Sequence, residues 1–568
     1  MKDKESKKAF ENLPACVEEY IKLVIKKMRW QKKVREDVQA EFIAHFEDAL
    51  HECKTNEEKE KAAKELIENF GDAELIAVLA RRAKKRCRPL WQKLFIRAFQ
   101  FVGIVIVLFI VYFIWFVSGK PTITTNYIEV ANNLGRPTAD ESQNAAPLYE
   151  LAAKTFDQQE YKCDSDYLSK SFYEVNQIDI NHIKKWINQN DATLNLIAQG
   201  TEKPLCWQKI KTPDSNDNAM LSVILPHLSG YRRAAYGICW RAYLSAQDEQ
   251  FQKALADTLT IYKFGQHQKG TRTLIENLVG ISMQNKSTDT IRTILEKNDI
   301  PNEFLIPFKD KFTKIINAED FSIVESFEFE KLFIYDEIQR SFVKSRFGIE
   351  HIYPKRLSVL MFGEGGNCND NSRQPKKLDS LFRYVNLMFS FQNSQKTRKS
   401  VDEYFDFWKD ITIATPHTFK ACDLNSEAYK VIDKNILLRL LSPAMEKIIS
   451  LSWRNRISSE STLTIVAVHV FKKQKGYLPE SLQELITSGF LTSVPIDPFS
   501  DKPIVYKKRN NDNFALYSVG LDFDDDGGKM EISKDGKPDM WNTKDGDAVF
   551  WPVEVFRQEL VPKNFSKS

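Results

Sequence analysis

The chain of 568 residues carries 81 Lys and Arg against 77 Asp and Glu, which leaves a formal net charge of +4. Its length exceeds what one hydrophobic core supports and indicates three or four domains. A mean hydropathy of −0.41 excludes a multi-pass transporter, and the small net charge means that any strongly basic surface must be local.

The first segment, residues 1–89, has the periodicity of a small helical bundle. Apolar side chains recur at three- and four-residue intervals from Pro14 to Met28, and three further helical segments follow up to residue 83. Gly71 is expected to end the third helix, because glycine readily adopts the left-handed conformation of that position. Asp72 is expected to cap the fourth helix.

This segment also contains a recognisable order of motifs. The sequence VREDVQAEFIAHFEDAL is followed by a charged connector and then by GDAELIAVLA ahead of an apolar run. The order resembles the HAAS-type, PadR-associated helical domain of membrane proteins, and the resemblance implies a cytoplasmic interaction module and not an enzyme. The residues that correspond to the family's recurring positions are Arg35, Glu36, Asp37, Glu47, Asp48, Phe70, Gly71 and Asp72.

A basic stretch from Arg81 to Arg97 covers the end of this segment and continues into residues 90–98, the juxtamembrane segment ahead of the apolar run. Because short segments rich in Lys and Arg stay on the cytoplasmic side, the N-terminal part is predicted to be cytoplasmic and the bulk of the chain extracytoplasmic. The stretch abuts the membrane, which favours anionic lipid headgroups over nucleic acid, and no nucleic-acid partner is expected. The eight residues that set this topology are Arg81, Arg82, Lys84, Lys85, Arg86, Arg88, Lys93 and Arg97.

The apolar run from Phe99 to Val117 has nineteen residues and no charge. As a helix it would be roughly 28 Å long, close to the hydrocarbon thickness of a bilayer. A buried core helix is the alternative, but such a helix would carry a polar stripe, and the run is too long and too far along the chain for a cleaved signal peptide. We therefore expect a single-pass protein of the bacterial inner membrane, with the lipid bilayer as its partner.

After a polar linker, residues 118–143, the chain is predicted to be helical over residues 144–441. The clearest amphipathic stretches lie between Ala219 and Gln284. No H-E-x-x-H or G-x-S-x-G motif occurs, and the chain is not expected to be an enzyme. The alternative is an envelope hydrolase with a site in this region. A cavity where His and carboxylate side chains converge would favour the hydrolase, and a groove without them would favour binding.

Five of the eight cysteines follow the apolar run and would be extracytoplasmic, where disulfides form. There is no C-x-x-C sequence, so a thiol redox motif or ribbon-type zinc site has no support. Cys239 lies in an apolar helical stretch and is expected to be buried. The polar settings of the remaining four suggest two bridges, Cys163 with Cys206 and Cys368 with Cys422.

The last segment, residues 442–568, is predicted to be an α+β module. Ser442 and Pro443 are typical of a helix start, and the apolar pattern continues to about Lys475. Val505 and Tyr506 precede the polar sequence RNNDN, and residues 514–519 follow it, which predicts a hairpin of two short strands. The expected fold class is thus mainly α with a C-terminal module of one long helix and a small antiparallel sheet.

Three sequence segments of this module occur in a familiar order. They are GYLPESL from Gly476, PIDPF from Pro495 and YSVGLD from Tyr517. Their order and spacing resemble the globular domain of the type II secretion major pseudopilin. The chain departs from that family because its apolar anchor lies more than 300 residues upstream of the module.

The resemblance implies a calcium site, since the family's domain binds calcium in a loop after the Y-S-x-G strand. Clustered carboxylates beside a Gly-Gly turn also suit a hard cation, although the twelfth position of an EF-hand loop would hold Ser533 in place of Glu. A solvated acidic loop is the alternative. The expected calcium ligands are Asp522, Asp524, Asp526 and Asp539.

The function expected from the sequence is extracytoplasmic binding or scaffolding by a membrane-anchored protein. It would serve type II secretion, pilus-like machinery or envelope signalling, with protein partners in the envelope and in the cytoplasm. The sequence does not identify a small-molecule ligand.

Overall fold

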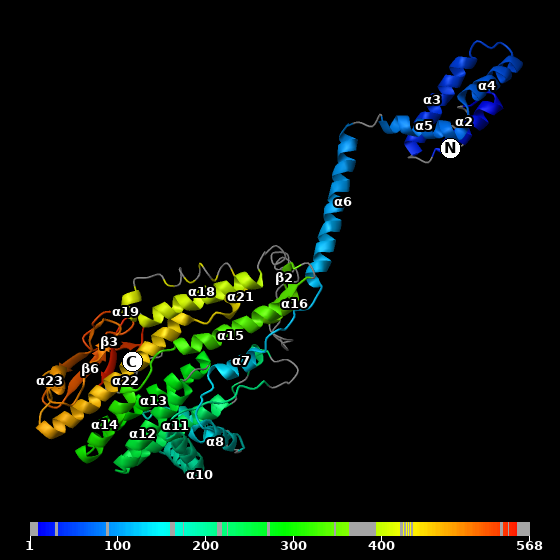
Figure 1. Cartoon of the computed structure of the whole chain (residues 1–568). Helices are drawn as coiled ribbons and strands as arrows, with labels where there is room; N and C mark the ends of the chain where they lie inside the picture. Colours follow the sequence, from blue (N-terminus) through cyan, green and yellow to red (C-terminus); the bar gives the residue numbers. More distant parts are fainter. Residues whose placement is uncertain are drawn as a thin grey trace, which may run out of the picture. The chain divides into compact units, whose positions relative to one another are not determined.

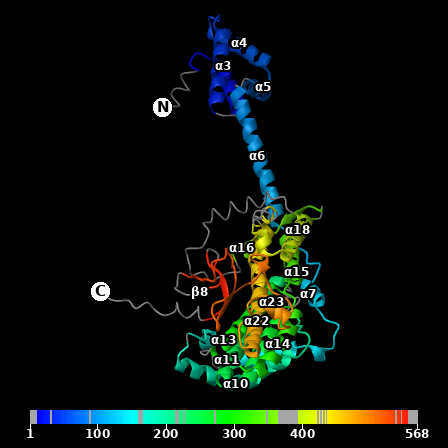
Figure 2. The ribbon, with the colours of Figure 1, turned by 90° about the vertical axis from the view of Figure 1, so that its left-hand side faces the viewer.

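The structure is a computed structural model of the whole chain, shown in two views in Figures 1 and 2. It forms two compact units, residues 1–115 and residues 116–568, and each is described by itself. The described residues are 10–28, 32–86, 90–158, 165–173, 175–212, 219–223, 225, 227–269, 273–345, 348–362, 393–420, 424, 428, 430, 432, 435–533, 538–542 and 545–553.

The chain is mainly helical, and its strands are confined to small antiparallel sheets, which confirms the expected fold class at that level. The first unit contains helices where the periodicity predicts them. They are α2 (Ala15–Lys27), α3 (Lys32–Leu50), α4 (Asn56–Phe70), α5 (Ala73–Arg86) and the start of α6 (Leu90–Val117).

The ends of α4 and α5 follow from local chemistry. The Thr55 side chain accepts a hydrogen bond from the Glu58 backbone N–H while the Glu58 side chain accepts one from Thr55, which closes a capping box at the start of α4. Gly71 ends α4 with a φ of 83°. The Asp72 carboxylate then accepts a hydrogen bond from the Leu75 N–H at 3.3 Å, so this residue caps α5 as predicted.

Buried side chains of α2–α5 form one hydrophobic core. Phe46 is fully buried in it and contacts the ring of Phe70, and the Tyr20 hydroxyl donates a hydrogen bond to the Gly71 carbonyl at 3.0 Å. The Gly71 turn is therefore held by the core as well as by its own backbone conformation.

The second unit is built from helices that run on to the C-terminal module. Helix α22 packs along α13 and α14 and is the longest of the described helices. The helices are α7 (Tyr127–Leu134), η1 (Glu141–Gln143), α8 (Ala146–Gln158), α9 (Ser165–Ser169), α10 (Gln177–Thr201), η3 (Met220–Ser222), α11 (His227–Gln247), α12 (Phe251–Gln268), α13 (Leu274–Lys297), α14 (Asn302–Asn317), α15 (Val324–Ser341), α16 (Pro354–Phe362), α18 (Ser394–Ile413), α19 (Pro416–Phe419), α21 (Ile436–Leu441), α22 (Met445–Lys475) and α23 (Leu482–Thr487).

A three-stranded antiparallel sheet of order β5-β6-β9 lies in the C-terminal module. The predicted hairpin is confirmed, because Val505 of β5 pairs with Tyr517 of β6 and Lys508 pairs with Phe514. The other strands form two-stranded antiparallel sheets. The strands are β1 (Phe342–Lys344), β2 (Glu350–Ile352), β3 (Ile496–Asp497), β4 (Lys502–Pro503), β5 (Val505–Lys508), β6 (Phe514–Ser518), β7 (Glu531–Ile532), β8 (Pro538–Asp539) and β9 (Ala548–Trp551).

Helix α22 begins slightly later than the Ser442-Pro443 pattern predicts. The Ser442 N–H donates a 2.8 Å hydrogen bond to the Leu438 carbonyl and thereby closes the short helix α21, so the first residue of α22 is Met445. At the other end Gly476 has a φ of 84° and ends the helix as expected.

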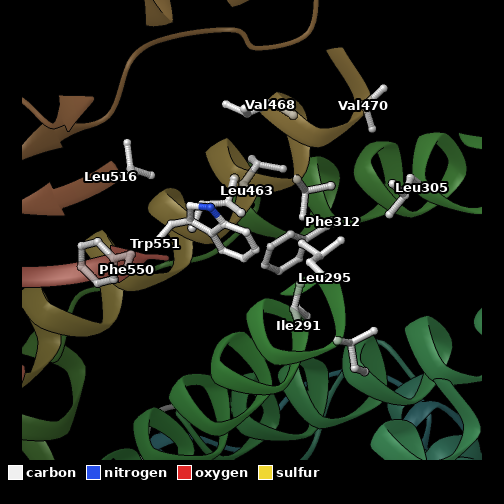
Figure 3. Packing of buried hydrophobic residues seen from close by; sticks show 14 of the residues in the cluster. Ile291, Leu295, Leu305, Phe312, Leu463, Val468, Val470, Leu516, Phe550 and Trp551 are labelled. Atoms are coloured by element: carbon white, nitrogen blue, oxygen red, sulfur yellow. The ribbon is translucent and has the colours of Figure 1, made fainter. Parts of the chain in front are cut away.

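Side chains from both sides of residue 442 share one hydrophobic core. Figure 3 shows Ile291, Leu295, Leu305 and Phe312 of α13 and α14 packed with residues of α22 and of strands β6 and β9. The boundary at residue 442 remains a prediction about folding units. In the folded chain the C-terminal module is packed onto the helical region. The labelled partners in that view are Leu463, Val468, Val470, Leu516, Phe550 and Trp551.

Candidate functional site

Helix α6 contains the segment Leu94–Val117, which is long and apolar enough to cross a membrane. It extends the predicted run, Phe99–Val117, toward the N-terminus. Only 6% of the most apolar part of this segment is buried within the protein. A buried core helix, which is the alternative to a membrane span, would be mostly covered by the rest of the protein. A helix that exposes apolar side chains around its whole circumference favours a lipid environment over water.

The basic residues before the span lie on two helices. Arg81 and Arg82 are exposed in the last turns of α5, and Lys84 forms an ion pair with Glu41 of α3. Arg97 lies in α6. The side chains of Lys85, Arg86, Arg88 and Lys93 lie outside the described part of the structure.

The acidic loop of the C-terminal module follows strand β6. Among the described residues, the carboxylates of Asp522, Asp526 and Asp545 each have an oxygen within 4.8 Å of the others. Two of the predicted ligands, Asp522 and Asp526, are in this group. Asp524 and Asp539 are not part of it, and Asp545, which the predicted set omits, is.

Backbone N–H donors connect two segments of the chain, residues 526–528 and 546–547. The Gly546 N–H donates to the Asp526 carboxylate at 3.0 Å, and the Gly528 N–H donates to the Asp547 carboxylate at 2.6 Å. Gly546 has a φ of 97°, and a Cβ there would lie 2.5 Å from the Glu531 nitrogen, so this close approach requires glycine. Asp545 therefore comes to Asp522 and Asp526 through a contact distant in sequence.

Burial and nearby negative charge disfavour the charged form of Asp522. Partial burial raises the pKa of Asp522, and the charges of Asp526 and Asp545 raise it further. Burial raises the pKa of the neighbouring Asp547 to about 6. Oxygens that share one Ca²⁺ at about 2.4 Å can be up to about 4.8 Å apart, so the three oxygens fit one such ion. A cation there would relieve the repulsion.

Asp497 explains why two of the pseudopilin-like segments occur together. Its buried carboxylate accepts hydrogen bonds from the Ser518 hydroxyl at 2.7 Å, from the Val519 N–H at 3.0 Å and from the Phe499 N–H at 3.1 Å. Burial raises the pKa of Asp497, and these donors act against the rise. The PIDPF segment thus fixes the end of β6, from which the acidic loop begins.

A cleft of about 700 Å³ lies where α22 meets the segment between α14 and α15. Its rim carries two exposed isoleucines, Ile413 (78% exposed) and Ile496 (52% exposed). The described lining residues are Ile316, Asn317, Glu319, Asp320, Phe321, Ser322, Ile323, Val324, Thr412, Ile413, Ile449, Ser452, Trp453, Arg456, Glu460, Leu463, Thr464, Leu491, Thr492, Ser493, Val494, Pro495 and Ile496.

The polar groups of the cleft are organised along α22. The Arg456 guanidinium pairs with Glu460 at 3.0 Å and lies 5.4 Å from the centre of the Trp453 ring. Burial raises the pKa of Glu460, and Arg456 counteracts this. The Ser452 hydroxyl donates to the Phe321 carbonyl and ties α22 to the opposite wall.

Neither His nor Cys is among the described lining residues of this cleft. The same holds for a second cavity of about 630 Å³ between α12 and α14, whose described lining includes Glu202, Lys263 and Lys311. No sequence motif indicates the cleft, because its walls come from four separate segments spread over residues 316–496.

The predicted disulfides fall largely outside the described residues. Cys163, Cys368 and Cys422 all lie outside them, and Cys206 lies between α10 and η3. Both pairings therefore stay predictions. Cys239 is fully buried in α11, and burial raises the pKa of its thiol to about 11, so it is a buried apolar side chain as expected.

Comparison of the chain with protein-family models, with curated proteins and with solved structures finds no match.

Proposed function

We propose that this protein is a single-pass protein of a bacterial inner membrane that binds another envelope protein through its second unit. The observation that carries the proposal is α6, whose apolar side chains face outward with only 6% of the most apolar part buried. The basic residues lie at its N-terminal end, so the first unit would be cytoplasmic and the second extracytoplasmic. The HAAS-like first unit would bind a cytoplasmic partner.

The cleft on α22 is the proposed binding site of the second unit. Its rim isoleucines, Ile413 and Ile496, offer apolar surface, while the exposed Arg456 offers a donor and the partly buried Glu460 an acceptor. Apolar surface combined with a few polar groups is typical of a site for a protein segment.

Calcium would stabilise the C-terminal module. Asp522, Asp526 and Asp545 would hold the ion, which would neutralise carboxylates that repel each other. The pseudopilin-like segments favour type II secretion or pilus-like machinery as the source of the partner, with an envelope-signalling complex as the alternative source.

Site-specific photo-crosslinking in intact cells tests this function. A crosslinking amino acid would replace Ile413 or Ile496 in the full chain, and Ile178, which is 68% exposed on α10 and does not line the cleft, would be the control position. The proposal predicts one shared partner at positions 413 and 496 and none at 178, and a weaker yield when Arg456→Glu is added. Identical products at all three positions, or none at the two cleft positions, would contradict it.

A further inference from the structure

Helix α5 of the first unit presents an apolar strip to its surroundings. Leu75 is 58% exposed, Val78 41% and Leu79 48%, and their spacing of three and four residues places them on one face. Ala73 and Ala77 on the opposite face are buried in the core of α2–α5. The exposed strip is therefore not needed to hold this unit together.

The same exposed face continues into positive charge. Arg82 lies three residues after Leu79 and seven after Leu75, so it extends the apolar strip toward the C-terminal end of the helix. Arg81 is exposed beside it. The face is thus apolar in its first turns and basic in its last.

The position of α5 in the chain limits how far this face can move from a membrane. Helix α5 ends at Arg86, α6 begins at Leu90, and the apolar span begins at Leu94. Four residue steps reach at most roughly 14 Å even when fully extended. If α6 spans the bilayer, the basic end of α5 stays near the headgroups.

We propose that α5 lies on the anionic surface of the membrane that α6 spans, with Leu75, Val78 and Leu79 inserted among the lipids and Arg81 and Arg82 at their phosphates. Leucine side chains flanked by basic ones are the composition of helices that lie in the bilayer interface. A second protein copy is the less suitable occupant, because three side chains fall well short of the roughly 800 Å² that each partner contributes to a stable protein interface.

The consequence is a cytoplasmic unit whose orientation depends on the charge of the leaflet. Anionic lipid would keep α5 bound to the membrane surface. Dissociation of α5 from that surface would expose the apolar strip to a cytoplasmic partner. This inference rests on the proposed spanning role of α6, but it does not depend on what the cleft of the second unit binds.

The test uses the full chain in lipid nanodiscs and a membrane-impermeant maleimide. Leu79→Cys or Val78→Cys places a thiol in the strip, and Glu65→Cys, on the exposed face of α4, is the matched control. Labelling at each position is read from peptide masses, so the native cysteines do not interfere. In phosphatidylglycerol discs we expect positions 78 and 79 to label at least about tenfold more slowly than position 65. In phosphatidylcholine discs, or with Arg81→Glu and Arg82→Glu, that difference should shrink to about threefold or less.

Three results would overturn the inference, and they are distinguishable. Equal labelling of positions 79 and 65 in phosphatidylglycerol discs would show that α5 is off the membrane. Protection that is unchanged in phosphatidylcholine and in detergent, and that rises with protein concentration, would show a protein contact. A chain that is not retained in the discs would contradict the spanning role of α6, and this inference with it.

Discussion

The Arg292 guanidinium on α13 donates a hydrogen bond to the Thr462 hydroxyl on α22 at a distance of 2.9 Å. It also donates to the Ser458 hydroxyl at 3.2 Å and forms an ion pair with Asp289. Arg292 is buried, and burial lowers its pKa, so this charge depends on its three partners. It links the helical region to the long helix of the C-terminal module.

Arg292→Ala should lower the free energy of unfolding of the second unit by about 3 kcal/mol. The substitution leaves two buried hydroxyls with fewer partners and removes the packing of the guanidinium 5.4 Å from the Phe550 ring. Urea unfolding of the detergent-solubilised chain measures it. The control is Arg456→Ala, whose side chain is exposed and should cost no more than about 0.5 kcal/mol. Equal stabilities of the two variants would contradict a linking role for Arg292.

Gly280→Ala should destabilise the contact between α12 and α13. A Cβ at Gly280 would lie 2.5 Å from the Gly265 carbonyl oxygen, so the two helix backbones would have to separate. We expect a loss of about 2 kcal/mol or more in the same unfolding experiment. At Gly230 on α11 a Cβ would make an ordinary 3.4 Å contact with Ala153. Gly230→Ala should therefore be neutral or stabilising by up to about 1 kcal/mol, and a similar loss in both variants would refute the packing argument.

His469 should make the second unit sensitive to acid. Burial lowers the pKa of His469 to about 4, the charges of Lys472 and Lys473 act in the same direction, and Asp299 acts against them. In the unfolded chain the ring titrates near 6.5, so the unfolded chain binds more protons between about pH 4 and 6.5. The contribution of the neutral His469 ring to the free energy of unfolding is therefore fully present above pH 6.5 and is lost as the pH falls toward 4.

His469→Phe keeps an aromatic ring against Phe514 and Trp551 and removes the titrating group. Between pH 7.5 and pH 5 the unmodified chain should lose about 2 kcal/mol more of its unfolding free energy than this variant does. Parallel pH dependences in the two proteins would show that His469 is not the group responsible.

Calcium should raise the melting temperature of the chelator-treated chain, and the ligand variants should show which carboxylates hold it. Asp545→Asn should abolish the response, because Asp545 belongs to the group of three close carboxylates. Asp524→Asn should leave most of it, because the Asp524 carboxylate is outside that group. The reverse pattern would favour the ligand set expected from the sequence. If calcium does not raise the melting temperature of the unmodified chain, the proposed calcium site is wrong.

Local signals in the sequence were sufficient for the helices of the first unit and for the hairpin, but α7 lies within residues 118–143, which were predicted to be a linker. Gly71 and Gly476 mark helix ends where the structure has positive φ angles, and the polar turn RNNDN between two apolar stretches marks the hairpin in which Val505 pairs with Tyr517. These features depend on residues a few positions apart, which is why composition and spacing predict them.

The remaining features depend on contacts between distant residues. Asp545 lies close to Asp522 because the chain near Gly546 contacts the chain near Asp526, and the cleft is lined by Ile413 and Ile496 from two separate segments. The start of α22 was also misplaced, because Ser442 closes α21 in place of capping α22. The spacing of residues along the sequence does not indicate contacts between segments that are so far apart.

Protease protection in intact spheroplasts tests the membrane topology most directly. We expect added protease to cut beyond residue 117, to degrade the second unit and to leave a protected fragment that contains residues 1–117. We also expect that alkaline carbonate does not extract the chain from the membrane. Loss of the first 90 residues with protection of the last 100 would contradict the account, because the compartments of the two units would be reversed.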